Sequence, residues 1–194
     1  MTAVRAEGPA GVQAEFEGML TPILQMAYGT AVRLTRDRTE AEDLIQDAAL
    51  LAFRAFGSFE RGTNFKAWFF RILTNAFYSR HRRDKHEKAN LSVEEVPPLY
   101  LYSRTEATGI RNAEGDPASA ILDRLDTERV GEALDRLPEE YRTVATLYFI
   151  DDFAYQQIAE VLQCPIGTVR SRLHRGRRML QKALWDIAVE RGIV

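Results

Sequence analysis

The sequence predicts an all-α protein made of two small helical domains joined by a flexible linker. Apolar residues recur at steps of three and four in both halves of the 194-residue chain, and no stretch shows the alternating pattern of a strand. Between the halves, residues 90–117 lose this periodicity and are rich in acidic residues, glycine and proline. Because so long an irregular segment is rare inside one compact domain, we place the linker there.

The first domain is expected over residues 15–89, after a disordered tail at residues 1–14 that is rich in alanine and glycine. Its first helix should run from the start of the domain to about Thr35. Thr39 and Glu42 fit a capping box, which predicts where a second helix begins, and that helix should reach residue 55. The side chains expected to be buried in the second helix are Leu44, Ile45, Ala48, Leu51, Ala52 and Ala55.

A third helix is predicted from Asn64 to about Arg83, after a loop at residues 57–63. Its expected core stripe consists of Phe65, Phe69, Ile72, Leu73 and Ala76. A second stripe, turned away from the core, consists of Trp68, Arg71, Asn75, Tyr78, Ser79 and Arg82. Aromatic rings can stack on unpaired bases, and each stacked base contributes roughly 1–3 kcal/mol to binding. Arginine binds phosphate, and asparagine can pair with a base edge. This stripe fits opened nucleic acid, although the rings of Trp68 and Tyr78 could equally serve to cover the core.

The second domain, expected over residues 118–194, contains a predicted helix-turn-helix. Two helical patterns are interrupted at Gln163-Cys164-Pro165, because proline cannot donate a backbone hydrogen bond inside a helix. Between Arg170 and Lys182 the second helix carries six basic residues and no acidic one. A helix that enters a DNA groove needs such a face, and a solvated basic surface is the alternative. The expected buried residues are Ile158, Ala159, Val161 and Leu162, then Val169, Leu173, Met179 and Leu180.

Other functional classes find little support in the composition. The net charge is only −2, so the distribution of charge says more than the sum. Basic residues are concentrated between Lys66 and Lys88 and again between Arg170 and Lys182. The single cysteine, Cys164, permits no internal disulfide and no cysteine-based zinc site. There is no glycine-rich phosphate loop and no nucleophile elbow, so we expect no metal, no cofactor and no enzymatic activity. The chain lacks a signal sequence and an apolar run that could span a bilayer; we expect a cytoplasmic protein without membrane insertion.

The helix-turn-helix resembles domain 4 of bacterial sigma factors. The segment from Pro165 to Leu173, followed by Arg175 and Arg177, is similar to the recognition helix of that domain. Leu137-Pro138-Glu139-Glu140-Tyr141-Arg142 and Tyr155-Gln156-Gln157-Ile158-Ala159 match the same domain in order and spacing.

The first domain resembles domain 2 of the extracytoplasmic-function (ECF) sigma factors, group 4 of the sigma-70 family. Residues 42–47 with 53–56 are similar to region 2.2. Regions 2.3 and 2.4 are matched by Ser58, Phe59, Gly62, Phe65, Trp68, Arg71, Ile72 and Asn75. The order of the two domains, with no domain 3 between them, is that of the ECF group.

The resemblance implies a sigma factor that directs core RNA polymerase to promoters. Domain 4 would bind the −35 duplex through Thr168, Arg170, Ser171, His174, Arg175 and Arg178. Domain 2 would capture the melted −10 strand through Phe59, Asn64, Trp68, Arg71, Asn75, Tyr78, Ser79 and Arg82. It would bind core polymerase through Asp43, Leu44, Gln46, Asp47, Leu50 and Arg54. The implied partners are the β′ clamp helices and β flap of the polymerase, promoter DNA and an anti-sigma factor.

Two other functions stay open at this point. A stand-alone helix-turn-helix regulator would bind a palindromic operator without polymerase, but it leaves Trp68 and Asn75 unexplained. A decoy that titrates an anti-sigma factor would be expected to lose its basic recognition face, and that face is intact. The acidic linker, which contains tyrosines, could either mimic RNA in the exit path of the polymerase or act as a solvated tether.

Overall fold

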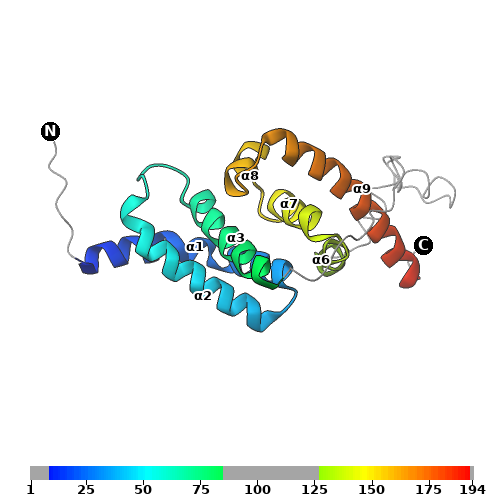
Figure 1. The fold of residues 1–194 in the computed structure, drawn as a ribbon. Coiled ribbons are helices and arrows are strands. Elements are labelled where there is room, and N and C mark those ends of the chain that lie inside the picture. Colours follow the sequence, from blue (N-terminus) through cyan, green and yellow to red (C-terminus); the bar gives the residue numbers. More distant parts are fainter. Residues whose placement is uncertain (1–8, 85–126, 193–194) are drawn as a thin grey trace, which may run out of the picture. The chain divides into compact units, whose positions relative to one another are not determined.

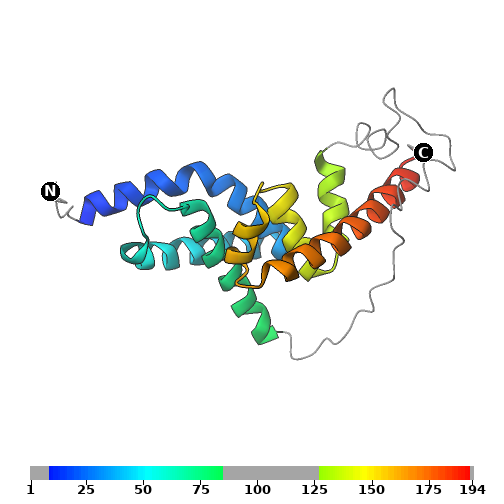
Figure 2. The same cartoon turned by 90° about the horizontal axis from the view of Figure 1, so that it is seen from above.

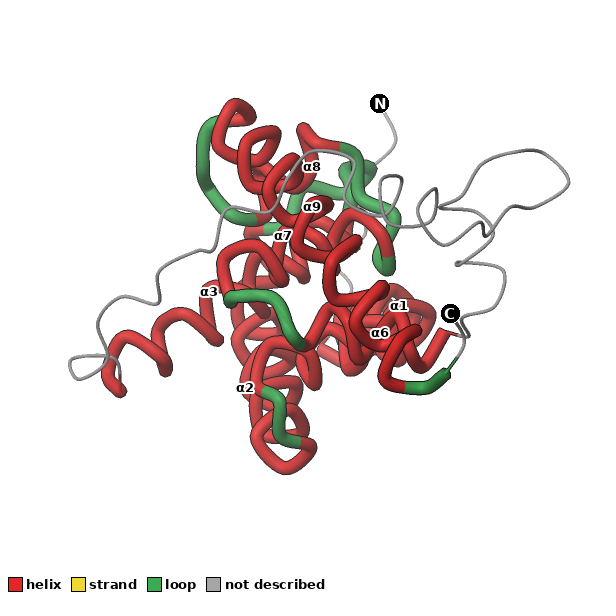
Figure 3. The backbone as a smooth tube through the Cα atoms, turned by 90° about the vertical axis from the view of Figure 1, so that its right-hand side faces the viewer, coloured by secondary structure: helices red, strands yellow, loops and turns green. Residues whose placement is uncertain are grey.

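The computed structural model describes residues 9–84 and 127–192, and these residues form helices and turns without a strand (Figure 1). The all-α prediction is therefore confirmed for this part of the chain; Figure 3 shows its helices joined by loops. The contacts divide it into two compact units. Residues 156–163 group with the amino-terminal helices, and the remaining carboxy-terminal residues form the second unit. The predicted linker lies outside the described residues, so the domain limits stay predictions.

Residues 9–84 of the amino-terminal unit form four consecutive elements. They are α1 (Pro9–Thr35), α2 (Arg38–Ala55), the short 3-10 helix η1 (Phe56–Ser58) and α3 (Phe65–Asp84). Helix α1 begins at Pro9, within the stretch predicted to be a disordered tail. Proline suits this position because the first turn of a helix does not need its backbone N–H.

The predicted capping box at the start of α2 is wrong. The cap is Asp37, whose carboxylate accepts a hydrogen bond from the Glu40 backbone N–H at 2.9 Å. The preceding Arg36 has a left-handed backbone (φ 62°), which turns the chain out of α1 before Thr39 is reached. Aspartate accepts such a hydrogen bond at least as well as threonine, so α2 starts earlier than expected.

The core of the amino-terminal unit combines small residues on α2 with phenylalanine rings. On α2 the fully buried residues are Ala41, Leu44, Ala48 and Ala52. Leu51 was expected inside, but it is 45% exposed. Ile45, Ala55, Ile72 and Ala76, also expected inside, are only half-buried. The small residues let α1 and α3 pack closely on α2, while rings from all three helices fill the remaining space; Phe16 and Phe56, for example, meet edge to face at 5.2 Å.

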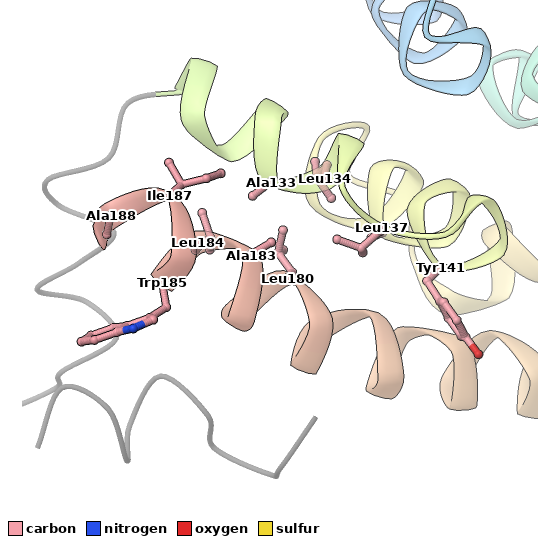
Figure 4. Close-up of a cluster of buried hydrophobic side chains, with 11 residues drawn as sticks. Ala133, Leu134, Leu137, Tyr141, Leu180, Ala183, Leu184, Trp185, Ile187 and Ala188 are labelled. Atoms are coloured by element: carbon pink, nitrogen blue, oxygen red, sulfur yellow. The ribbon is translucent and has the colours of Figure 1, made fainter. Parts of the chain in front are cut away.

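In the carboxy-terminal part, α6 (Thr127–Asp135) and α7 (Glu139–Phe149) pack on the long helix α9 (Ile166–Glu190), which Figure 2 shows as one continuous rod. The short helix α8 (Tyr155–Val161) precedes α9 in the chain. Figure 4 shows the buried cluster that joins α9 to α6 and α7. It consists of Ala133, Leu134, Leu137, Tyr141, Ala145, Leu180, Ala183, Leu184, Trp185, Ile187 and Ala188.

An exposed network of ion pairs joins α6 to the end of α9. The Arg136 guanidinium donates hydrogen bonds to both Glu190 (2.7 Å) and Glu132 (3.2 Å), and Arg191 lies 3.4 Å from Glu132. None of the helices in the described ranges is long and apolar enough to cross a membrane.

Candidate nucleic-acid interface

A pocket lies where the loop after η1 enters α3. Its lining includes Ser58, Phe59, Glu60, Thr63, Asn64, Ala67, Trp68 and Arg71. The loop is built by short-range hydrogen bonds, because the Thr63 hydroxyl and backbone N–H both donate to the Glu60 carbonyl, at 2.6 and 3.2 Å. Gly62 supplies a left-handed turn (φ 89°) that other residues adopt only with strain.

Asn64 begins α3 as its capping residue. Its side-chain oxygen accepts a hydrogen bond from the Ala67 backbone N–H at 3.0 Å. The same side chain is exposed and lines the pocket. Asn64 therefore has a structural task in addition to the predicted DNA contact.

Trp68 both covers the core and lines the pocket. Its ring lies 5.1 Å from that of Phe59, 5.5 Å from Phe65 and 6.5 Å from Phe56, and the side chain remains half-buried. The alternative that this tryptophan packs on the core is thus correct in part. Phe59 itself is only 3% exposed. In the folded chain it is a core residue whose ring supports Trp68, and its assignment as a −10 contact stays a prediction.

The remaining residues of the α3 stripe lie along one side of the helix. Arg71 is half-buried at the pocket, and Asn75 follows one turn later with its amide exposed. Tyr78 is half-buried and Ser79 exposed. Arg82 lies in the last turn of α3, and its side chain falls outside the described residues.

The predicted polymerase contacts on α2 separate into an exposed group and one buried residue. The exposed group consists of Asp43, Gln46, Asp47, Leu50 and Arg54. These positions recur at steps of three and four and share one face of the helix. Leu44 belongs to the opposite, fully buried stripe, and its assignment as a polymerase contact stays a prediction.

Arg80 of α3 reaches across to this exposed face. Its guanidinium pairs with the Asp47 carboxylate and donates a hydrogen bond to the Asp43 carbonyl at 3.3 Å. The contact was not foreseen from the sequence, because it joins residues on different helices that follow no local spacing rule.

The break predicted between the helices of the helix-turn-helix is confirmed. Helix α8 ends at Val161, Gln163 adopts a left-handed backbone (φ 50°), and Pro165 precedes the first turn of α9. The Pro165 carbonyl accepts a hydrogen bond from the Thr168 N–H at 2.8 Å. Proline thus begins the second helix, while the turn itself depends on the strained glutamine.

Some basic residues of α9 contact α7, and others are exposed to solvent. Arg172 pairs with Glu140 of α7 at 3.5 Å. The Arg177 guanidinium lies over the rings of Tyr148 (5.3 Å) and Phe149 (5.7 Å), which is a cation–π arrangement. Arg172 thus holds α9 to the first turn of α7, and Arg177 holds it to the aromatic end of α7.

The residues of α9 that were predicted to contact the −35 duplex are at least partly exposed to solvent. Arg170, Ser171, His174 and Arg175 are exposed, and Thr168 and Arg178 are half-buried. A hydrogen bond with the Tyr141 hydroxyl raises the pKa of Arg175. The predicted set therefore presents an exposed cationic face near the start of α9.

No group of three or more histidine, cysteine, aspartate or glutamate side chains that could hold a metal ion occurs in the portion of the chain that the structure describes.

Comparison with known proteins identifies both parts of the chain. Residues 19–87 match the family model of Sigma-70 region 2, and residues 127–180 match that of Sigma-70, region 4. The ECF RNA polymerase sigma factor SigW of Bacillus subtilis is 32% identical over 178 residues, covering 91% of this chain and 92% of SigW. The chain belongs to the ECF sigma factors. The sigma-H factor of Pseudomonas aeruginosa is similarly related, at 30% identity over 184 residues, with 93% of this chain and 91% of that protein covered.

Solved structures extend the likeness to the fold of this ECF sigma factor. The sigma factor RpoE of Bartonella quintana, solved in complex with the anti-sigma factor NepR, is 31% identical. It superposes with a TM-score of 0.63 over 88% of this chain and 96% of RpoE. CnrH, solved with the cytosolic domain of CnrY, shares the fold at 23% identity, with a TM-score of 0.56 and 90% of each chain covered.

Proposed function

We propose that this ECF sigma factor directs core RNA polymerase to promoters by gripping DNA at two elements. The main support for this proposal is that one chain combines two different surfaces. The cationic face of α9 lies in the segment that matches region 4, and Trp68 with the pocket residues from Ser58 to Arg71 lies in the segment that matches region 2. The stand-alone regulator is not favoured, because it accounts only for the first of these surfaces.

At the −35 element, the start of α9 would enter the major groove of the duplex. Arg170, Ser171 and His174 are exposed there, and cations suit a groove walled by phosphates. Arg175, which is also exposed, is suited to a phosphate contact. Half-buried Thr168 and Arg178 would make contacts at the margins of this face.

At the −10 element, the pocket before α3 would receive an unstacked base. Trp68 supplies a partly exposed ring beside it, and Arg71 supplies a charge for the backbone phosphate. Asn75 can pair with a base edge from the next turn of α3, where Tyr78, Ser79 and Arg82 continue the path of the strand. Phe59 and Asn64 would act mainly by shaping the pocket.

We assign polymerase binding to the exposed face of α2 formed by Asp43, Gln46, Asp47, Leu50 and Arg54. A leucine surrounded by charged and amide groups fits a protein partner, here the β′ clamp helices. The region 4 part would meet the β flap. A dedicated anti-sigma factor is a further proposed partner, because the related RpoE is solved with NepR. We also propose that the chain acts in the cytoplasm and has no catalytic activity of its own.

In vitro transcription on a genomic library tests this function. Purified core polymerase should initiate at a defined set of promoters only when the chain is added. If the chain instead bound palindromic DNA without polymerase and added no new start sites, the proposal would be refuted. DNA binding by the free chain should be weak and should fall with added salt.

A further inference from the structure

The loop between η1 and α3 is connected to α1 by an ion pair distant in sequence. The Arg61 guanidinium donates two hydrogen bonds to the Glu15 carboxylate, Nε to Oε1 at 3.1 Å and Nη2 to Oε2 at 3.0 Å. This is a two-point arginine–carboxylate contact, which fixes the orientation of both groups. We call Glu15 and Arg61 the loop latch.

Arg61 also contacts the loop itself. Its Nη1 atom donates a hydrogen bond to the Phe59 carbonyl at 3.4 Å, and its guanidinium carbon lies 4.7 Å from the centre of the Phe56 ring. Phe56 stacks on Phe59 at 5.9 Å, and Phe59 in turn supports Trp68 at 5.1 Å. A continuous series of contacts therefore leads from α1 to the ring that lines the pocket.

The middle of the loop is exposed to solvent. Glu60, Gly62 and Thr63 are exposed, and the hydrogen bonds between Thr63 and Glu60 are local to the loop. Glu15 and Arg61 are themselves partly exposed, at 30% and 46% of their side-chain surface. An exposed pair of this kind adds little to global stability. Its main effect would be to limit the conformations of the loop before a ligand arrives, which reduces the ordering cost of binding.

We propose that Arg61, held by Glu15, is a positioning residue that fixes the loop in the conformation required to discriminate the −10 base. The inference rests on the proposed function, since it concerns selectivity at the same pocket. Neither residue needs to touch the base; they act through Phe56, Phe59 and the loop backbone.

Two conservative variants test the latch in reconstituted holoenzyme on promoters recovered from the genomic library. Glu15→Gln removes the charge, and Arg61→Lys keeps the charge but cannot form the two-point contact. Each should lower the ratio of initiation on the preferred −10 base to initiation on the other bases by roughly 2- to 30-fold. Core binding, −35 dependence and melting temperature should stay close to those of the wild type.

Matched controls separate the latch from general effects of charge. Glu17→Gln changes an exposed glutamate on the same helix, and Arg38→Lys changes an exposed arginine of α2; both should keep wild-type selectivity. The charge-reversed double variant Glu15→Arg with Arg61→Glu should recover part of the selectivity lost by either single reversal. Latch variants that discriminate bases as well as these controls would overturn the inference.

A variant at the pocket distinguishes failure of the latch from failure of the proposed function. Asn75→Ala should reduce −10 selectivity whether or not the latch acts, because Asn75 lies on the exposed stripe of α3. If Asn75→Ala reduces selectivity and both latch variants do not, only the latch is refuted. If the wild-type holoenzyme itself shows no −10 selectivity, the proposed function and the latch fail together.

Discussion

Arg170 and Arg172 are two residues apart on α9, but their surroundings differ. Arg170 is exposed, whereas Arg172 is half-buried and pairs with Glu140. We expect Arg170→Ala to weaken holoenzyme binding to promoters that depend on the −35 element by about 1–3 kcal/mol if the side chain reads a base, with relaxed selectivity there. A phosphate contact would instead reduce affinity evenly across sequences and lower the salt dependence.

Promoter titrations at several salt concentrations measure this effect. Arg172→Ala is the matched control and should cost less, because its side chain already has a partner in the fold. Binding to core polymerase should persist in both variants. Loss of core binding with Arg170→Ala would contradict the assignment of α9 to DNA.

Asn64 shows how one residue can combine a structural and a binding role. Its side chain caps α3, so Asn64→Ala should lower the free energy of unfolding by about 0.5–2 kcal/mol. Asn64→Asp keeps an oxygen that can cap the helix and should retain most of that stability. Urea unfolding gives the first quantity, and −10 selectivity of the Asp variant shows whether the amide also contacts DNA. Equal stability of the Ala variant and the wild type would exclude the cap.

At the scale of the element, α2 presents two faces with opposite tasks. Leu50 is 56% exposed, whereas Leu44 is fully buried. Leu50→Glu should leave the free energy of unfolding within about 0.5 kcal/mol of the wild type but weaken binding to core polymerase. Leu44→Ala should instead destabilise the fold by about 2–5 kcal/mol, because it leaves a cavity.

Chemical unfolding and a pull-down with core polymerase separate the two effects. A Leu50→Glu variant that is stable and still binds core polymerase with wild-type affinity would remove α2 from the proposed docking surface. One carboxylate of this face, that of Asp47, is already partly neutralised by its ion pair with Arg80.

For the molecule as a whole, acid should remove a small stabilising contribution from each unit. Hydrogen bonds from Arg61 lower the pKa of Glu15, and hydrogen bonds from Arg136 lower that of Glu190. A carboxyl group with a lowered pKa in the folded state binds more protons when unfolded, so stability rises with pH through this range. The contribution should be complete above the ordinary value of 4.5 and be lost as the pH falls through the lower folded pKa.

Urea unfolding between about pH 7 and pH 3 measures this dependence. Glu15→Gln and Glu190→Gln should each flatten the curve below pH 4.5 and leave its slope near neutral pH unchanged. Curves that coincide with that of the wild type would show that these ion pairs do not contribute to stability.

Local patterns in the sequence were sufficient to predict the fold class, the family and most of the exposed residues of both surfaces. Hydrophobic periodicity is a local property, and it correctly indicated the helices and the stripes that include Phe69, Leu73 and Leu180. The break at Gln163-Cys164-Pro165 could be predicted for the same reason, since the backbone limits of proline do not depend on distant contacts. The motifs at the start of α9 and around Trp68 led to the ECF sigma factors, which the relatives confirm.

The packing of the helices determines which side chains near the sites are accessible and which distant residues meet, and this could not be predicted from local patterns. Phe59 and Leu44 belong to motifs that resemble binding regions, but burial depends on how neighbouring helices pack, so a motif cannot reveal it. Asp37 caps α2 in place of Thr39, because the left-handed backbone of Arg36 ends α1 and lets α2 begin earlier than the sequence pattern indicated. The Glu15–Arg61 and Asp47–Arg80 pairs join residues 46 and 33 positions apart. No local period brings such residues together; the packing of α1 and α3 against α2 does.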